Sequence, residues 1–164
     1  MQSGLCLDKV IASTEGIYTI NLQDYKGTDT VYTGTIYFDM QGDPDGKFIF
    51  DSGSDWIVTH NYYDHTLSES LSSLEVYPMH IDYESLQLKG NMIEDLVCLE
   101  RGAACVRMEF IEVMKVTPSN FEYDGVIGMG PINHGQGDRL IEQLYRHNII
   151  NELKATFWLN KSGT

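Results

Sequence analysis

The sequence predicts a mostly β protein, a partly closed barrel or a sandwich, with one helix near its C-terminal end. Two observations predict this class. Short apolar or alternating segments recur along the chain, and turn-rich pieces such as QGDPDG and LERGAA separate them. One stretch alone, GDRLIEQLYRHNIINEL (137–153), has apolar residues at helical spacing. Many short strands with a single helix are typical of an all-β domain.

The predicted strands follow one another along the chain, at residues 16–22, 30–40, 47–51, 55–59, 74–83, 86–99, 105–116, 125–129 and 154–160. Their β-branched and aromatic residues suit a half-buried pleated surface. The predicted helix covers about residues 138–148, because Leu140, Ile141, Leu144 and Tyr145 share one helical face and Asp138 lies near the start. We expect this face to pack on the sheet as part of the core.

Length and charge limit the possible functions. A chain of 164 residues is about one domain long, and we see no domain boundary within residues 1–164. The formal charge of −13 argues against a nucleic-acid partner and against an anionic membrane surface. No run approaches the ~18 apolar residues that a membrane span needs. The start, MQSGLCLDKVIAS, has neither the basic residues nor the apolar stretch of a signal peptide.

The three cysteines do not predict a disulfide scaffold. Cys98 and Cys105 flank LERGAA, whose composition is typical of a hairpin loop, so a bridge between them is sterically conceivable. Cys6 would then have no partner. We expect buried free thiols, because three scattered cysteines are not a typical disulfide framework.

The segment FIFDSGSDWIV (48–58) places an acid at the end of an apolar strand. An unpaired carboxylate is costly at the end of a buried strand. One interpretation is an ordinary turn, because Asp, Ser and Gly are common turn residues. The other is a catalytic carboxylate, Asp51, held at the mouth of a cleft.

Two further segments decide between these interpretations. They are IDYESLQLKGNMIEDLV (81–97) and FEYDGVIGMGP (121–131), and the predicted helix and KATFWLNKSG follow them. In order and spacing, the three segments resemble the N-terminal lobe of the pepsin-like aspartic proteases (family A1). That family has an apolar strand ending in Asp-Thr/Ser-Gly-Ser, a flap hairpin reading Ile-x-Tyr-Gly-Ser/Thr-Gly-Ser, and a buried strand reading Asp-Gly-Ile/Val-Leu/Ile-Gly-Leu/Met-Gly. The resemblance covers roughly residues 18–163.

The resemblance implies a role for each matching residue. It makes Asp51 catalytic, and it implies that a peptide or protein is the substrate and that no cofactor or metal is needed. Gly53 would allow a tight turn, Ser54 would donate a hydrogen bond to Asp51, and Tyr83 on a mobile hairpin would cover a bound peptide. The remaining implied site residues are Ser52 in the loop, Glu84 and Ser85 in the flap, and Asp124, Gly125 and Gly128 in the strand behind the site.

The sequence also departs from the family pattern. Trp56 is displaced from the position of the family's tryptophan, and Glu84 and Leu86 replace flap glycines. The family's usual disulfide after the active-site loop is absent. The family suggests a secretory or endolysosomal compartment, which the missing signal peptide and disulfide leave undecided.

Catalysis in this family uses two aspartates, one from each lobe, which share a proton. The chain has no second Asp-Ser/Thr-Gly. We therefore predict one lobe that supplies Asp51 and needs a second lobe or chain, as a homodimer or heteromer, to cleave peptides. The alternative is a pepsin-fold protein without catalysis, which acts as a structural or interaction subunit.

The segment THNYYDH contains residue types that bind metal ions. His60, Asp64 and His65 lie close in sequence, but their spacing fits no recurrent ligand signature. The interpretation adopted is a polar loop without a metal.

Overall fold

The computed structural model describes residues 16–25, 31–42, 44–83, 86–117, 121–131 and 137–158. Within these residues the chain forms a nine-stranded sheet, one α-helix and a short 3₁₀-helix. The mostly β class with one C-terminal helix is therefore confirmed. The elements are β1 (Gln23–Asp24), β2 (Tyr32–Gly34), β3 (Tyr37–Phe38), β4 (Phe48–Asp51), β5 (Ile57–His60), η2 (His65–Leu67), β6 (Ser73–Tyr83), β7 (Leu86–Glu100), β8 (Ala103–Thr117), β9 (Gly125–Gly128) and α1 (Leu140–Arg146).

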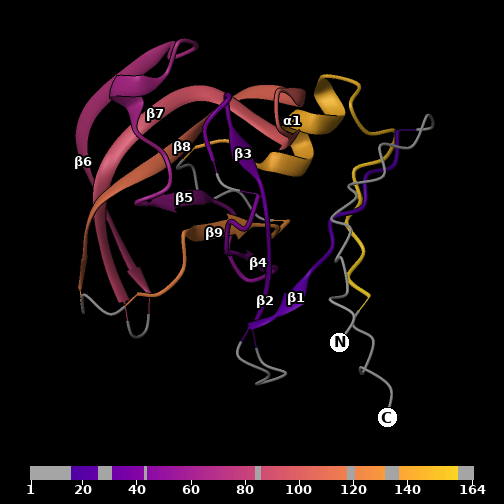
Figure 1. Ribbon diagram of the computed structural model, residues 1–164, viewed down its shortest axis with the longest axis horizontal. Coiled ribbons are helices and arrows are strands. Elements are labelled where there is room, and N and C mark those ends of the chain that lie inside the picture. Colours follow the sequence, from indigo (N-terminus) through magenta and orange to yellow (C-terminus); the bar gives the residue numbers. More distant parts are fainter. Residues whose placement is uncertain are drawn as a thin grey trace, which may run out of the picture.

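The strand order places β9 in the middle of the sheet, although it is the last strand in sequence. The order is β1-β2-β4-β9-β5-β8-β7-β3, and β6 pairs with β7. β4 runs parallel to β9 and β5 runs parallel to β8, whereas the other pairs are antiparallel. The long β7–β8 hairpin arches over the shorter strands (Figure 1). β4 and β5, which a loop connects, are thus separated by a strand from far along the chain.

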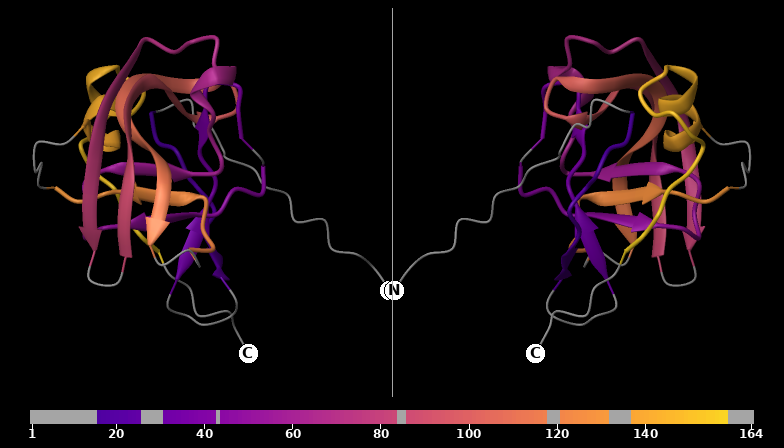
Figure 2. Two further views of the ribbon diagram at one scale, coloured as in Figure 1. Left: turned by 90° about the vertical axis from the view of Figure 1, so that its left-hand side faces the viewer. Right: turned by 90° about the vertical axis from the view of Figure 1, so that its right-hand side faces the viewer.

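Two groups of buried apolar side chains hold this sheet together. The first is rich in aromatic rings: Phe38 lies 4.7 Å from Phe110, measured between ring centroids, and α1 adds Leu140 and Leu144. The second includes Val58 of β5 and Val126 of β9. Burying each such side chain contributes roughly 1.5–3 kcal/mol. Helix α1 packs against β8 at one end of the sheet (Figure 2).

The helix lies where it was predicted, but the set of residues predicted to be buried on it is partly wrong. Leu140 and Leu144 are buried as expected, but Tyr145 is 43% exposed and Gln143 is buried instead. Seven residues make two turns, so a small rotation of the helix decides which flank faces the sheet. Asp138 does not cap the helix, because its carboxylate accepts the backbone N–H of Glu109 on β8.

Three predicted strands differ from the observed ones. Residues 16–22 and 154–158 form no strand, and the described part of the predicted strand 30–40, residues 31–40, divides into β2 and β3. A backbone hydrogen bond from Asn151 N to Gly16 O, at 3.2 Å, ties the start of the first segment to residues just before the second. A strand needs a continuous neighbouring partner, which local sequence cannot guarantee.

The expectation of free thiols at Cys98 and Cys105 is wrong. The two residues face each other across β7 and β8 and form a disulfide, with Cα atoms 3.9 Å apart. Pairing of the two strands brings these positions together. Cys6 lies outside the described residues.

Among the described residues, no helix is both long and apolar enough to cross a membrane.

Candidate active site

The loop after β4 presents Asp51 between two strands of the sheet. Asp51 is the last residue of β4 and is half-buried, while Ser52 and Gly53 are exposed. The backbone N–H of Gly53 donates a 2.8 Å hydrogen bond to Asp51 Oδ1. The backbone carbonyl of Asp51 accepts the N–H of Met129 at 2.8 Å. Asp51 is thus held in two ways. Its carboxylate is bound within its own loop, and its backbone carbonyl is bound by the segment that follows β9.

Strand β9 supports this loop from behind. Gly128 donates its N–H to the carbonyl of Trp56, and Gly130 donates to the carbonyl of Ser54, both at 2.7 Å. A Cβ atom on Gly128 would lie 2.3 Å from the backbone nitrogen of Trp56, and one on Gly125 would lie 2.0 Å from the carbonyl oxygen of Val58. Glycine is therefore required here because the strands approach too closely for any side chain.

Asp124 has a structural position at the start of the same strand. Its carboxylate accepts the backbone N–H of Lys47 at 2.7 Å, and its own N–H donates to the carbonyl of Lys47 at 3.0 Å. Its carbonyl accepts the N–H of His60 at 2.7 Å. Asp124 thus ties the start of β4 to the end of β5.

The expected hydrogen bond from Ser54 to Asp51 is not formed. Ser54 is buried, and its hydroxyl has no hydrogen-bond partner among the described residues. The backbone of Ser54 is held by Gly130, and this contact fixes the loop without the side chain. In its place, the N–H of Gly53 is the donor to the Asp51 carboxylate.

The hairpin that corresponds to the flap is formed by β6 and β7. At the end of the described part of this hairpin, Tyr83 of β6 pairs with Leu86 of β7. Glu84, Ser85 and the side chain of Tyr83 lie outside the described residues.

The part of this hairpin nearest its turn belongs to the second core. Ile81 and Leu88 are buried there with Val58 and Val126, and Trp56 packs against them. The displaced Trp56 therefore joins the exit of the Asp51 loop to the turn end of the hairpin through apolar contact.

A buried carboxylate, Asp95, lies on β7. It is fully buried and accepts hydrogen bonds from Tyr63 Oη at 2.6 Å, Ser68 Oγ at 2.5 Å, Ser70 Oγ and the backbone N–H of Leu96 at 2.7 Å. Burial by itself would raise the pKa of Asp95, but these donors together lower it below its ordinary value. Burial, and then donation to Asp95, raises the pKa of Tyr63. Asp95 is an anionic anchor for the 63–70 segment.

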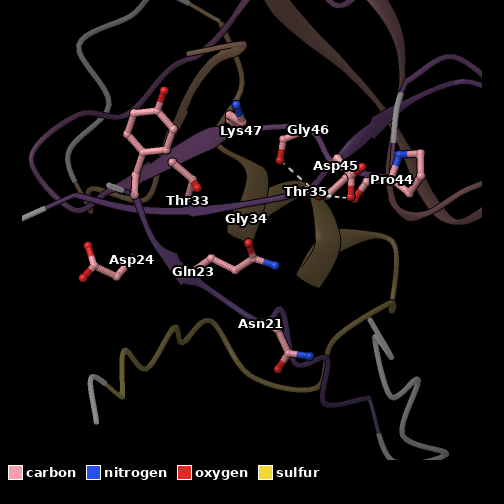
Figure 3. Close-up of a pocket in the computed structure, with 11 residues that line it drawn as sticks. Asn21, Gln23, Asp24, Thr33, Gly34, Thr35, Pro44, Asp45, Gly46 and Lys47 are labelled. Carbon is pink, nitrogen blue, oxygen red and sulfur yellow. Dashed lines mark hydrogen bonds between the residues drawn. The ribbon is translucent and has the colours of Figure 1, made fainter. Parts of the chain in front are cut away.

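Two cavities lie outside the Asp51 loop. A polar cavity of about 400 Å³ is lined by β1, β2 and residues 44–47, where the Thr35 hydroxyl donates to the carbonyls of Pro44 and Gly46 (Figure 3). Lys47, which lines this cavity, lies just before β4, whereas Asp51 is the last residue of that strand. At ~3.3 Å per residue, the two positions are about 13 Å apart along the strand. A larger, mainly apolar groove of about 1220 Å³ runs between segments 16–22 and 150–158 and includes Phe50 and Met129 beside the loop.

The polar loop near His60 contains a cluster that the sequence only partly indicated. Asp64 and His65 lie together with Glu112 of β8, while His60 contacts Asn61 instead. Glu112 is 47 residues from His65 in sequence, so only the parallel pairing of β5 with β8 could reveal it.

Asp51 lies at the start of the loop that joins β4 to β5, and strand β9, with Gly125 and Gly128, passes close to this loop. This arrangement defines an aspartic-protease-type lobe. The family model of eukaryotic aspartyl proteases matches residues 45–164. The chain belongs to this family, as the resemblance implied. No curated protein matched the chain.

Proposed function

We propose that residues 1–164 form one lobe of an aspartic endopeptidase, with Asp51 as one of two catalytic carboxylates. The observation that supports this most directly is the position of Asp51, half-buried at the end of β4 on a loop held by β9. A loop fixed in this way preorganises a reacting group, and preorganisation is what catalysis requires.

The reaction requires a second aspartate from another lobe. Two adjacent carboxylates share one proton, so that one activates a water molecule and the other protonates the peptide carbonyl. A second lobe of similar fold would place its aspartate opposite Asp51. In a two-fold symmetric dimer, a residue near the axis meets its own copy.

The apolar strip formed by residues 16–22 and 150–158 supports this partner. Figures 1 and 2 show the two segments on the same side of the molecule, and both line the apolar groove that also includes Phe50. Trp158 is 88% exposed there, and Ile17, Leu153 and Phe157 are exposed too. Exposed apolar patches of this kind mark interaction surfaces. The occupant that we propose is a second lobe of the same fold, bound against this strip.

The test compares Asp51→Asn with wild type in a peptide-library digest from pH 3 to 7. Sedimentation run alongside reports the state of assembly. We expect cleavage only by an assembled form, fastest in acid where one carboxylate of the pair is protonated, and we expect Asp51→Asn to abolish it. Asp45→Asn, the same change in the turn before β4, is the matched control and should retain cleavage.

The unpaired Ser54 hydroxyl favours a second candidate function, a non-catalytic subunit of the same fold. An assembled wild type with no cleavage at any pH would support that candidate. Cleavage by a proven monomer, or cleavage that Asp51→Asn leaves intact, would contradict the paired mechanism.

A further inference from the structure

A cluster separate from the Asp51 loop is formed by Asp64, His65 and Glu112. The Asp51 loop precedes β5 in sequence, whereas Asp64 and His65 follow it and Glu112 lies in β8. Their ligand atoms, one per residue, all lie within 4.8 Å of one another. We propose that this cluster, here called the 64/65/112 site, binds a divalent transition-metal ion of the zinc class through one imidazole nitrogen and two carboxylates.

Glu112 is the buried member of the site. It lies on β8, paired with Thr59 of β5 and Asn91 of β7, and it is 7% exposed. A carboxylate in such a position needs a cationic or hydrogen-bonding partner. Among the described residues, the hydrogen bonds of its carboxylate are with His65: Oε1 accepts the backbone N–H at 3.2 Å and Oε2 lies 2.7 Å from Nδ1.

Asp64 is held in place by hydrogen bonds to described residues, and these leave one carboxylate oxygen available. Its Oδ1 accepts the backbone N–H of Thr66 at 2.9 Å and the hydroxyl of Thr66 at 2.6 Å. Its backbone exchanges two 3.0 Å hydrogen bonds with the side-chain amide of Gln41. None of these bonds uses Oδ2.

The dimensions suit zinc after a small adjustment. Zinc bonds of about 2.0–2.2 Å in a tetrahedron place ligand atoms roughly 3.3–3.6 Å apart. The 2.7 Å contact between His65 and Glu112 must therefore open by under about 1 Å, and a pair as wide as 4.8 Å must close by up to about 1.5 Å. The ion would replace the hydrogen bond between His65 and Glu112. Rotation of exposed Asp64 can supply the closing movement.

The ligand types favour zinc over calcium or magnesium. An imidazole ligand suits zinc and its neighbours in the first transition row, whereas calcium and magnesium prefer oxygen ligands alone. Three protein ligands leave a fourth position for water. The chain's formal charge of −13 also raises the local concentration of cations.

A bound ion would join the segment after β5 to the central strand β8. An ion that binds only the folded state stabilises the fold by mass action. We therefore expect zinc to raise the melting temperature of the full chain, and to do so whether or not a second lobe is present. This readout does not depend on peptidase activity.

The experiment titrates metal-free full-length chain with Zn²⁺ by calorimetry and with Co²⁺ by visible absorption. We expect one ion per chain, a rise in melting temperature with zinc, and the intense d–d bands of tetrahedral cobalt. Ca²⁺ and Mg²⁺ should produce no comparable shift. Absence of saturable zinc and cobalt binding to wild type would overturn the proposal.

Variants identify the site. Asp64→Asn keeps an oxygen to accept from Thr66 but removes the ligand charge, so zinc affinity should fall at least tenfold while the metal-free melting temperature is unchanged. Glu112→Gln should lose binding further. His80→Asn removes the exposed His80–Asp82 pair, whose atoms lie 3.2 Å apart, and should bind zinc as wild type does. Zinc binding retained by Asp64→Asn and Glu112→Gln, or lost in His80→Asn, would contradict this site.

Discussion

At Asp95, three hydroxyl groups and one backbone N–H surround a carboxylate with no exposed surface. These donors favour the ionised form, and their combined effect outweighs the cost of burial. Because the folded-state pKa is below the unfolded value, this residue contributes stability above the unfolded pKa. The contribution is lost as the pH falls through the folded-state pKa.

We predict that Asp95→Asn lowers the free energy of unfolding by about 3 kcal/mol at pH 7, because an amide leaves hydroxyl donors poorly matched. The difference between wild type and variant should shrink as the pH falls below the ordinary carboxyl value of 3.8. Chemical denaturation at several pH values measures both quantities. A difference that stays constant down to pH 2 would contradict the low pKa.

The glycines of β9 allow a second prediction at this scale. Gly125→Ala places a Cβ 2.0 Å from the carbonyl oxygen of Val58, so the backbone must shift. We expect this substitution to lower the free energy of unfolding by at least about 1–3 kcal/mol. Gly53→Ala is the matched control: it is exposed, its Cβ would lie 3.2 Å from Asp51 Oδ1, and its cost should be smaller. Denaturant unfolding compares the two. Equal losses would show that close strand approach is not the cause.

At the scale of elements, the β7–β8 hairpin combines strand pairing with a covalent link. The register places Cys98 directly opposite Cys105, near the turn that joins the strands. A cross-link that closes a short loop restricts the unfolded chain only modestly. Strand pairing, rather than the disulfide, must therefore supply most of the hairpin's stability.

We predict that replacing both cysteines with serine costs no more than about 3 kcal/mol of unfolding free energy and leaves the fold intact. A reducing agent should lower the stability of wild type by a similar amount and should leave the double variant unchanged. Denaturation with and without reductant gives the comparison. A variant that is unfolded at 25 °C, or one that still responds to reductant, would contradict this assignment.

At the scale of the whole molecule, the apolar strip of residues 16–22 and 150–158 is the surface proposed for the second lobe. The groove beside it reaches Phe50 and Met129, the neighbours of Asp51 and Gly128. A partner bound to this strip would therefore lie on the same part of the molecule as the catalytic loop. We therefore expect assembly and activity to be lost together.

We predict that Trp158→Glu prevents association between copies of the chain and leaves monomer stability within about 0.5 kcal/mol, because the ring is 88% exposed. Leu67→Glu, a comparable change at an exposed residue outside the strip, should associate as wild type does. Sedimentation over a range of concentrations measures this. Wild type that stays monomeric throughout would contradict pairing between copies.

The sequence alone determined the fold class, the place of the helix and the lineage. Periodicity and turn residues mark strands directly, because side chains alternate across a sheet with a fixed period. The glycine segment 125–130 could be assigned to the strand behind Asp51, since close approach of backbones excludes every other residue. Asp51 could likewise be placed at the end of its strand.

Tertiary structure alone decided which residues meet across the sheet. Strand order brought β9 between β4 and β5, placed Cys98 opposite Cys105 and joined Glu112 to His65. It also left Ser54 without its expected contact and residues 16–22 without a continuous strand partner. Local sequence specifies conformation and side-chain chemistry, but contacts between distant segments depend on pairing and register, which the packing of the whole chain selects.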